Sequence, residues 1–181
     1  ATFRTGGKAG YVDTVAFGAY RRSIFEEVGL FYEQLIRNQD DEFNYRITKA
    51  GHKIYFDPEI KSDYFVRASF EKLKGQYFQY GYWKVFVNKK HGAITTLRQM
   101  IPMFMVLYTF VGLFTFLYSN PLLFRLYLSG LAFYIIVGVL SAQRVSRSGF
   151  DMMQVLQAFI ILHFSYGVGY LKGTWQFVIL N

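Results

Sequence analysis

Hydrophobic and polar positions divide the chain into two parts. From about residue 99 onward, three long apolar segments follow one another, at residues 101–118, 122–140 and 152–171. Each is close to the ~20 residues that a helix needs to cross a hydrocarbon core of ~30 Å. Polar residues dilute the third segment, so an interfacial or re-entrant helix is the alternative there. We therefore expect an all-α membrane region over residues 99–181.

The first part alternates strand-like and helix-like patterns, which favours an α/β fold. Gly29 and Gly51 are placed to end two short helices. The expected elements are a buried strand within 11–20, helices at 21–28 and 40–50, and strands at 52–56 and 60–66. Residues 1–68 are thus predicted to form a water-soluble α/β piece.

Residues 69–98 are expected to form an amphipathic helix at the membrane surface. Ser69 can cap it, and residues 72–98 carry six basic side chains and no acidic one. Its lysines are expected to lie away from a broad apolar face that includes Phe70, Leu73 and Tyr77. A basic stretch directly before an apolar segment favours anionic lipid headgroups.

Composition supports lipid as a partner. Hydrophobic residues make up 52 % of the 181 positions and aromatic residues 20 %. The net charge of +8 arises beyond residue 71, because residues 1–71 hold ten basic and eleven acidic side chains, so nucleic-acid binding is not expected. Absent cysteine excludes disulfides, and three distant histidines suggest no metal motif. Basic residues flank the apolar segments before residue 98 and at 144–147, which predicts a cytoplasmic side there.

The densest polar cluster lies at residues 39–46, where Asp40, Asp41 and Glu42 open a predicted helix. Such acids complement the helix dipole, and Glu42 with Arg46 forms an i,i+4 pair. A surface helix without any function is therefore one reading. The chain begins with Ala1, and we expect it to be the C-terminal part of a longer protein.

The neighbouring sequence favours a catalytic reading. The run Phe-Gly-Ala-Tyr-Arg-Arg-Ser-Ile-Phe-Glu-Glu-Val-Gly-Leu-Phe at 17–31 precedes the acidic cluster. Together they resemble the C-terminal half of the catalytic domain of family 2 glycosyltransferases, most of all the subgroup of succinoglycan-type exopolysaccharide assembly. The matching positions of the acidic motif are Asp40, Glu42, Phe43, Arg46 and Gly51, while Gln39 stands where Glu is common.

The resemblance implies the C-terminal part of a GT-A type fold and an inverting transfer from a nucleotide sugar. It assigns Asp40 as the general base, with Asp41 as the fallback, and adds Glu42 and Arg46 to the catalytic motif. The acceptor-binding candidates that it implies are Gly18, Ala19, Arg21, Arg22, Gln76, Tyr80 and Trp83. The helix keeps Gln76 but lacks the Arg-Trp pair of processive relatives, which favours transfer of a single sugar.

The resemblance also implies what lies outside the chain. The nucleotide-binding half, with the carboxylates for Mg²⁺ or Mn²⁺, is expected before residue 1, so this fragment should bind no metal and be inactive alone. The expected acceptor is a polyprenyl-diphosphate-linked saccharide, at an inner membrane with the catalytic part cytoplasmic. The alternative is a non-catalytic transport or assembly subunit with a docking domain, although such pathways need more polar residues within the spans.

Overall fold

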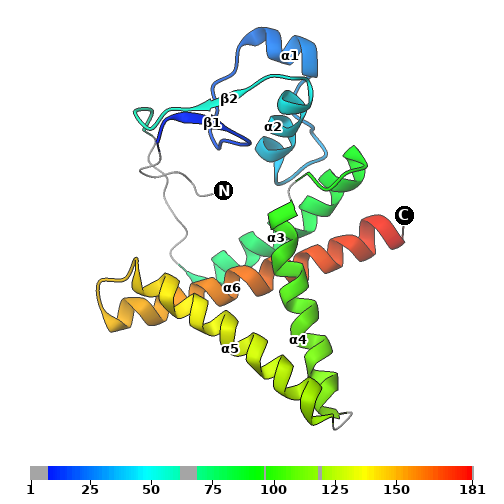
Figure 1. The fold of residues 1–181 in the computed structure, drawn as a ribbon. Coiled ribbons are helices and arrows are strands. Elements are labelled where there is room, and N and C mark those ends of the chain that lie inside the picture. The colour runs from blue at the N-terminus through cyan, green and yellow to red at the C-terminus, as the bar shows by residue number, and fades with distance from the viewer. Residues whose placement is uncertain (1–7, 62–68, 96, 118–119, 181) are drawn as a thin grey trace. The chain divides into compact units, whose positions relative to one another are not determined.

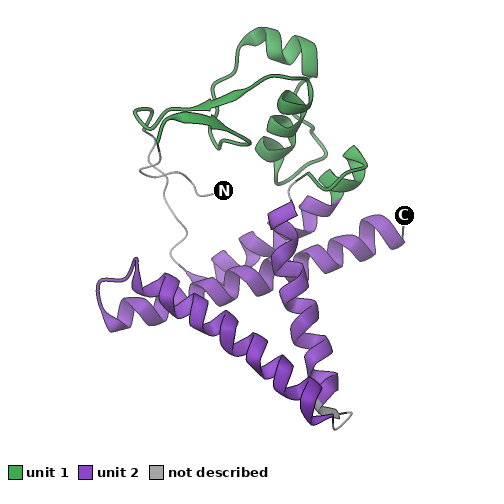
Figure 2. Ribbon diagram, in the orientation of Figure 1, with its two compact units in different colours: residues 1–66, 86–95 green, residues 67–85, 96–181 purple. Residues whose placement is uncertain are grey.

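The computed structural model describes residues 8–61, 69–95, 97–117 and 120–180 (Figure 1). The chain divides into two compact units (Figure 2). Unit 1 comprises residues 1–66 and 86–95, and unit 2 comprises residues 67–85 and 96–181. The described part is mostly helical, with one small sheet.

Unit 1 contains two short strands and two helices, followed by the last turns of helix α3. The elements are β1 (Gly10–Val12), α1 (Arg22–Val28), α2 (Gln39–Lys49) and β2 (Ile54–Phe56). The strands pair antiparallel, with Tyr11 opposite Tyr55. Gly29 and Gly51 follow the two helices with φ of 82° and 90°, which confirms them as helix-ending glycines.

The sheet differs from the sequence prediction. The expected strand within 11–20 is limited to β1, because the next residues bond to side chains of α2 and Phe17 adopts a left-handed backbone with φ of 57°. The strand expected at 52–56 is confirmed in part, as β2. The strand expected at 60–66 lies mainly outside the described residues, and Ile60 and Lys61 are not in a strand. A layered GT-A sheet is therefore not shown.

The core of unit 1 lies between α2 and the sheet. Its buried residues are Phe43, Ile47 and Ile54. The Phe43 ring stacks on Phe25 with centroids 5.1 Å apart and meets the Phe31 ring at 4.6 Å. Aromatic pairs of this kind add about 0.5–1.5 kcal/mol beyond area burial, so they fix α2 against the chain around α1.

Unit 2 is built from helices that the sequence pattern largely predicts. They are α3 (Phe70–His91), whose last turns belong to unit 1, then η1 (Leu97–Met100), α4 (Ile101–Leu117), α5 (Pro121–Gln143), α6 (Gly149–Thr174) and η2, a π-helix (Trp175–Ile179). Caps define several starts. Ser69 accepts from the Lys72 backbone N–H at 3.2 Å, which confirms the expected cap, and Asn120 accepts from the first turn of α5.

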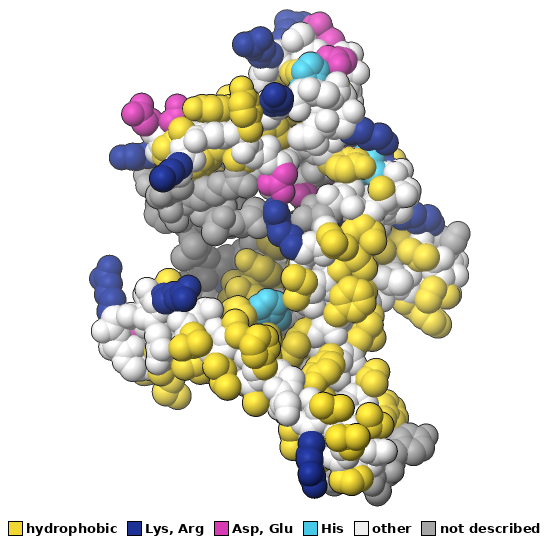
Figure 3. All heavy atoms as spheres, in the orientation of Figure 1, with side chains coloured by type: hydrophobic (Ala, Val, Ile, Leu, Met, Phe, Trp, Pro, Cys, Tyr) yellow, Lys and Arg dark blue, Asp and Glu magenta, His cyan; other side chains and the backbone are white. Residues whose placement is uncertain are grey.

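Among the described residues, three helices are long and apolar enough to span a membrane, at Leu97–Thr115, Pro121–Gln143 and Gly149–Ile179. The third is 31 residues long, more than the sequence pattern predicted. Hydrophobic side chains crowd the visible surface of α4 and α5 (Figure 3). Such large exposed apolar surfaces are rare on soluble proteins, so these helices are suited to lipid.

Helices α3 and α6 approach each other at glycines. A side chain at Gly81 of α3 would meet the backbone carbonyl of Tyr166, and one at Gly169 of α6 would meet that of Phe78. In η2, which follows α6, the Phe177 ring lies 4.8 Å from that of Tyr82. Small residues let helix backbones approach closely, so α3 packs along α6.

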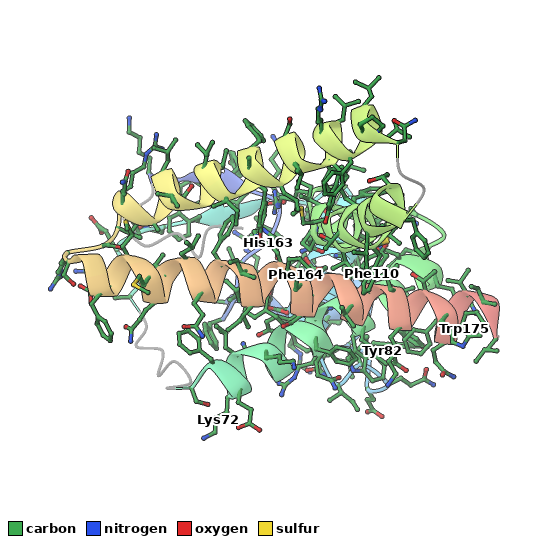
Figure 4. All side chains as sticks on the ribbon, turned by 90° about the horizontal axis from the view of Figure 1, so that it is seen from below. Lys72, Tyr82, Phe110, His163, Phe164 and Trp175 are labelled. Carbon is green, nitrogen blue, oxygen red and sulfur yellow. The ribbon has the colours of Figure 1, made fainter. Side chains whose placement is uncertain are left out.

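The lysines of α3 are not all placed as expected. Lys84 was predicted to face away from the apolar side, but its side chain is almost fully buried, with 1 % exposed. Lys90, in the last turns of α3 that belong to unit 1, lies 3.3 Å from the carboxylate of Glu42. Only part of the basic stretch is therefore available to lipid headgroups. His163 of α6, labelled in Figure 4, was expected to face a helix partner. Its contact with the Tyr134 hydroxyl of α5, at 3.1 Å, confirms this.

Candidate functional site

The first turn of α2, residues 39–42, carries the three consecutive acids and is called the acidic turn here. Helix α2 follows Asn38, whose φ of 63° is left-handed and whose side chain makes no capping hydrogen bond. Asp40 is exposed, Asp41 is half-buried and Glu42 is fully buried. The partial positive charge of a helix N-terminus favours ionised carboxylates. The three acids therefore share one turn but differ in access to solvent.

The Glu42 carboxylate is enclosed by basic side chains. It accepts from Arg46 Nε at 2.9 Å (Oε1) and 3.1 Å (Oε2) and from Arg46 Nη2 at 2.9 Å (Oε2). Its Oε1 also lies 3.3 Å from Lys90 Nζ and 3.0 Å from His91 Nε2. Burial alone would raise the pKa of Glu42, but hydrogen bonds and charges from Arg46 and Lys90 lower it below its ordinary value. Glu42 is thus ionised, and both of its oxygens are occupied by protein groups.

Arg46 extends this network to the turn after α1. Its Nη1 donates to the carbonyls of Val28 and Gly29, and its Nη2 donates to the carbonyl of Leu30 at 2.8 Å. The guanidinium has five N–H donors in a planar fork. Its nitrogens donate to Glu42 and to three consecutive backbone carbonyls, so Arg46 links helix α2 to the turn that follows α1.

Asn44 anchors the opposite side of α2. It is fully buried, and its Nδ2 donates at 2.8 Å both to Thr14 Oγ1 and to the Val15 carbonyl. Its Oδ1 accepts from the Tyr20 hydroxyl at 2.9 Å. A buried amide costs little only when it is satisfied. These three bonds therefore tie the acidic helix to the segment between β1 and α1.

The predicted acceptor-binding residues of unit 1 lie in that segment and at the start of α1. A side chain at Gly18 would place its Cβ 2.5 Å from the Tyr20 hydroxyl oxygen, so the Tyr20 ring would have to shift to accept one. Burial, aided by the charge of Asp40, raises the pKa of Tyr20. Ala19, Arg21 and Arg22 are exposed. The loop thus exposes two arginines to solvent beside the Gly18–Tyr20 contact, and the acceptor-binding role of these residues stays a prediction.

The other predicted acceptor-binding residues lie on the part of α3 that belongs to unit 2. Gln76 Nε2 donates to the Tyr80 hydroxyl at 2.7 Å, and Trp83 Nε1 donates to Gln79 Oε1 at 3.1 Å. All three predicted residues, Gln76, Tyr80 and Trp83, are half-buried. They form one polar and aromatic face of the helix, and their role in acceptor binding stays a prediction.

Sequence reasoning missed several polar groups around the acidic turn. Asn44 could have been noticed, because it sits between apolar positions of the same helix. Nothing in the sequence indicated that Lys90 and His91 contact Glu42, because His91 lies 49 positions beyond it and Lys90 directly precedes His91. Arg37 was also missed, and its buried Nε has no hydrogen-bond partner among the described residues. A buried donor without an acceptor is costly, which makes this nitrogen suited to a ligand oxygen.

Comparisons with known proteins support the resemblance inferred from the sequence. The chain is 34 % identical over 100 residues to the succinoglycan biosynthesis protein ExoA of Rhizobium meliloti. This match covers 55 % of this chain and 30 % of that protein. It is 32 % identical over 116 residues to a dolichyl N-acetyl-α-D-glucosaminyl phosphate 3-β-D-2,3-diacetamido-2,3-dideoxy-β-D-glucuronosyltransferase of Methanococcus voltae. That match covers 62 % of this chain and 36 % of the relative.

The predicted similarity to glycosyltransferases of exopolysaccharide and lipid-linked glycan synthesis is therefore confirmed. The chain spans about a third of the length of these curated relatives. No family model matches the chain. No solved structure matches it either.

Proposed function

We propose that this chain is the acceptor side and membrane region of an inverting glycosyltransferase that moves one sugar from a nucleotide sugar to a lipid-linked saccharide. The observation that carries the proposal is the difference in burial among the polar side chains of α2. Glu42, Asn44 and Arg46 are held by protein groups, whereas Asp40 is exposed on the first turn. The acid that matches the base of the similar glycosyltransferases is thus the one that a substrate can reach.

The proposed reaction is a single displacement. The acceptor hydroxyl oxygen attacks the anomeric carbon, its proton passes to the Asp40 carboxylate, and the bond to the nucleotide diphosphate breaks with its electron pair on the leaving oxygen. Asp40 lies at a helix N-terminus, where the partial positive charge of the helix dipole favours a carboxylate. Asp41 is the fallback base, although it is less exposed.

The proposed acceptor is anionic close to its lipid, as a polyprenyl diphosphate would be. Exposed Arg21 and Arg22 are suited to phosphate oxygens, with Arg22 also paired to Glu26 at 3.5 Å. Tyr80 and Trp83 provide aromatic faces for sugar rings.

The nucleotide-sugar site and its Mg²⁺ or Mn²⁺ are proposed to belong to a further part of the protein. Within the part of the chain that the structure describes, no group of three or more His, Asp or Glu side chains could hold a metal ion. Unit 1 also exposes large apolar side chains at Phe17, Leu30 and Ile36, which suits packing against further protein.

We also propose that unit 1 is cytoplasmic and that the protein lies in an inner membrane. The three long apolar helices supply the spans, and basic residues precede the first span and follow the second. A lipid-linked acceptor would then meet the enzyme at the membrane surface.

Substitution of Asp40 tests the proposal in the full-length protein. Asp40→Asn keeps the size of the side chain but removes the proton acceptor, so transfer from nucleotide sugar to a polyprenyl-diphosphate saccharide should fall by ~10²–10⁴-fold. Binding of the nucleotide sugar should stay within a few-fold. Asp41→Asn is the matched control, and it should retain most of the activity.

A larger loss at Asp41 than at Asp40 would move the base by one residue. Unchanged turnover in both variants would refute the catalytic reading and favour the docking alternative, in which the acids merely complement the helix dipole at about 0.3–1 kcal/mol.

A further inference from the structure

Glu42 is a buried charge whose partners come from two distant parts of unit 1. None of its side chain is exposed, and Arg46 and Lys90 both lie within ion-pair distance of it. Isolated buried charges are costly, so a buried carboxylate is retained only where its partners are well placed. The partners of Glu42 belong to α2 itself and to the end of α3.

The end of α3 is held at this point by more than the ion pair. Lys90 Nζ lies 3.0 Å from the centroid of the Tyr32 ring, and the His91 ring lies 4.6 Å from that of Tyr45. A lysine over an aromatic face is attracted by the negative charge of the ring face. Lys90 and His91 are thus fixed between Glu42 and aromatic rings of unit 1.

The acidic turn needs such an anchor. Asn38 provides no side-chain cap, and the first turn of a helix is where unpaired N–H groups and fraying concentrate. Glu42 is the only acid of that turn with no exposed surface, so its bonds hold the turn from the inner side. Asp40 lies two positions earlier on the same turn.

We propose that Glu42, Lys90 and His91 form a positioning network that fixes the acidic turn and with it the carboxylate of Asp40. The meaning of that position rests on the function proposed above. A misplacement of about 1 Å can cost 10²-fold in rate, so loosening the turn should lower turnover more than it lowers binding. Lys90 and His91 are positioning residues, because they act through Glu42 and do not touch the substrate.

The test uses the full-length protein and removes the cation at the rim of the network. Lys90 is 26 % exposed, so Lys90→Met should fold. We expect kcat to fall by about 10- to 100-fold with the KM for nucleotide sugar within a few-fold. Lys90→Arg should restore most of kcat. The matched control is Lys89→Met, which removes an exposed cation from the same turn of α3 and should leave kcat unchanged.

Hydrogen exchange supplies a readout that does not depend on activity. In Lys90→Met, the amides at the start of α2 should lose protection, while those of α1 keep theirs. Retained protection together with retained kcat would overturn the network. Lost protection with an unchanged kcat would mean that the network only stabilises the fold, and would overturn its positioning role.

Failure of the proposed function would look different. If Asp40→Asn stays fully active, Asp40 is not the base, while the exchange data still decide whether the network holds the turn. His91→Gln serves as a second variant, with a smaller expected loss of protection, because neutral His91 contributes a hydrogen bond and no ion pair.

Discussion

Gly81 of α3 offers a sharp test of how α3 packs on α6. A Cβ at this position would overlap the backbone carbonyl oxygen of Tyr166 and lie 2.9 Å from both the Tyr166 carbonyl carbon and the Tyr170 amide nitrogen. Favourable carbon contacts lie at about 3.5–4.0 Å. The obstacle is helix backbone, so it cannot rotate away as a side chain would.

The expected cost of Gly81→Ala follows from this overlap. The helices must separate by about 1 Å or more, which forfeits about half of each contact along the seam. Inserting an extra group into a packed core typically costs about 1–3 kcal/mol, and the better helix propensity of Ala offsets about 0.5–1 kcal/mol of that. Net destabilisation of about 1–2 kcal/mol is therefore expected.

Gly75 is the matched control on the same helix. Nothing lies within 4 Å of a Cβ built there, so Gly75→Ala should stabilise α3 by its propensity gain. Both tryptophans lie in unit 2, and the Trp83 ring is 5.8 Å from that of Phe177 in η2, directly after α6. Tryptophan fluorescence during heating in detergent therefore reports on this seam.

At ~2–4 °C per kcal/mol for a chain of this size, the midpoint should fall by about 2–8 °C in Gly81→Ala and rise slightly in Gly75→Ala. Equal upward shifts in the two variants would refute the close packing of α3 on α6.

Two further predictions concern orientation and pH. Because the chain has no cysteine, Asn120→Cys should react with an impermeant thiol reagent added from the side opposite unit 1, and labelling only after the inner membrane is permeabilised would contradict the proposed topology. Burial lowers the pKa of His91 below its ordinary 6.5, while Glu42 raises it and the charges of Lys90 and Lys49 lower it. The stability from neutral His91 is therefore full above about pH 6.5 and is lost as pH falls below it. Protection of the α2 amides against hydrogen exchange, corrected for intrinsic rates, should therefore decline from pH 7 to 5.5, and the decline should be smaller in His91→Gln. Equal declines in the two proteins would contradict this role of His91.

The parts of the fold that were predicted correctly have local signals. Gly29 and Gly51 mark helix ends because only a residue without Cβ adopts their positive φ easily. Ser69 marks a helix start through its hydroxyl. The apolar segments are recognised by length and composition alone, which is why their existence was predicted more accurately than their ends.

The parts that were missed depend on contacts distant in sequence. The expected strand beyond Val12 is absent because Asn44, about 30 positions away, takes up the Val15 carbonyl. The burial of Lys84 has the same kind of cause, since a lysine in a basic stretch gives no local sign of an enclosed environment. Tertiary context overrides pattern at these positions.

Helical geometry explains why Asp40 and Glu42 differ although both belong to one acidic motif. With 3.6 residues per turn, two positions correspond to a rotation of about 200°, so the two carboxylates leave the helix on nearly opposite sides. When Glu42 faces the interior and the basic groups there, Asp40 must face outward. Asp41 lies about 100° from each and is half-buried. A motif with acids at alternate positions on a helix is therefore suited to combining one buried structural charge with one exposed reactive charge, and shifting the helix by one residue would spoil both.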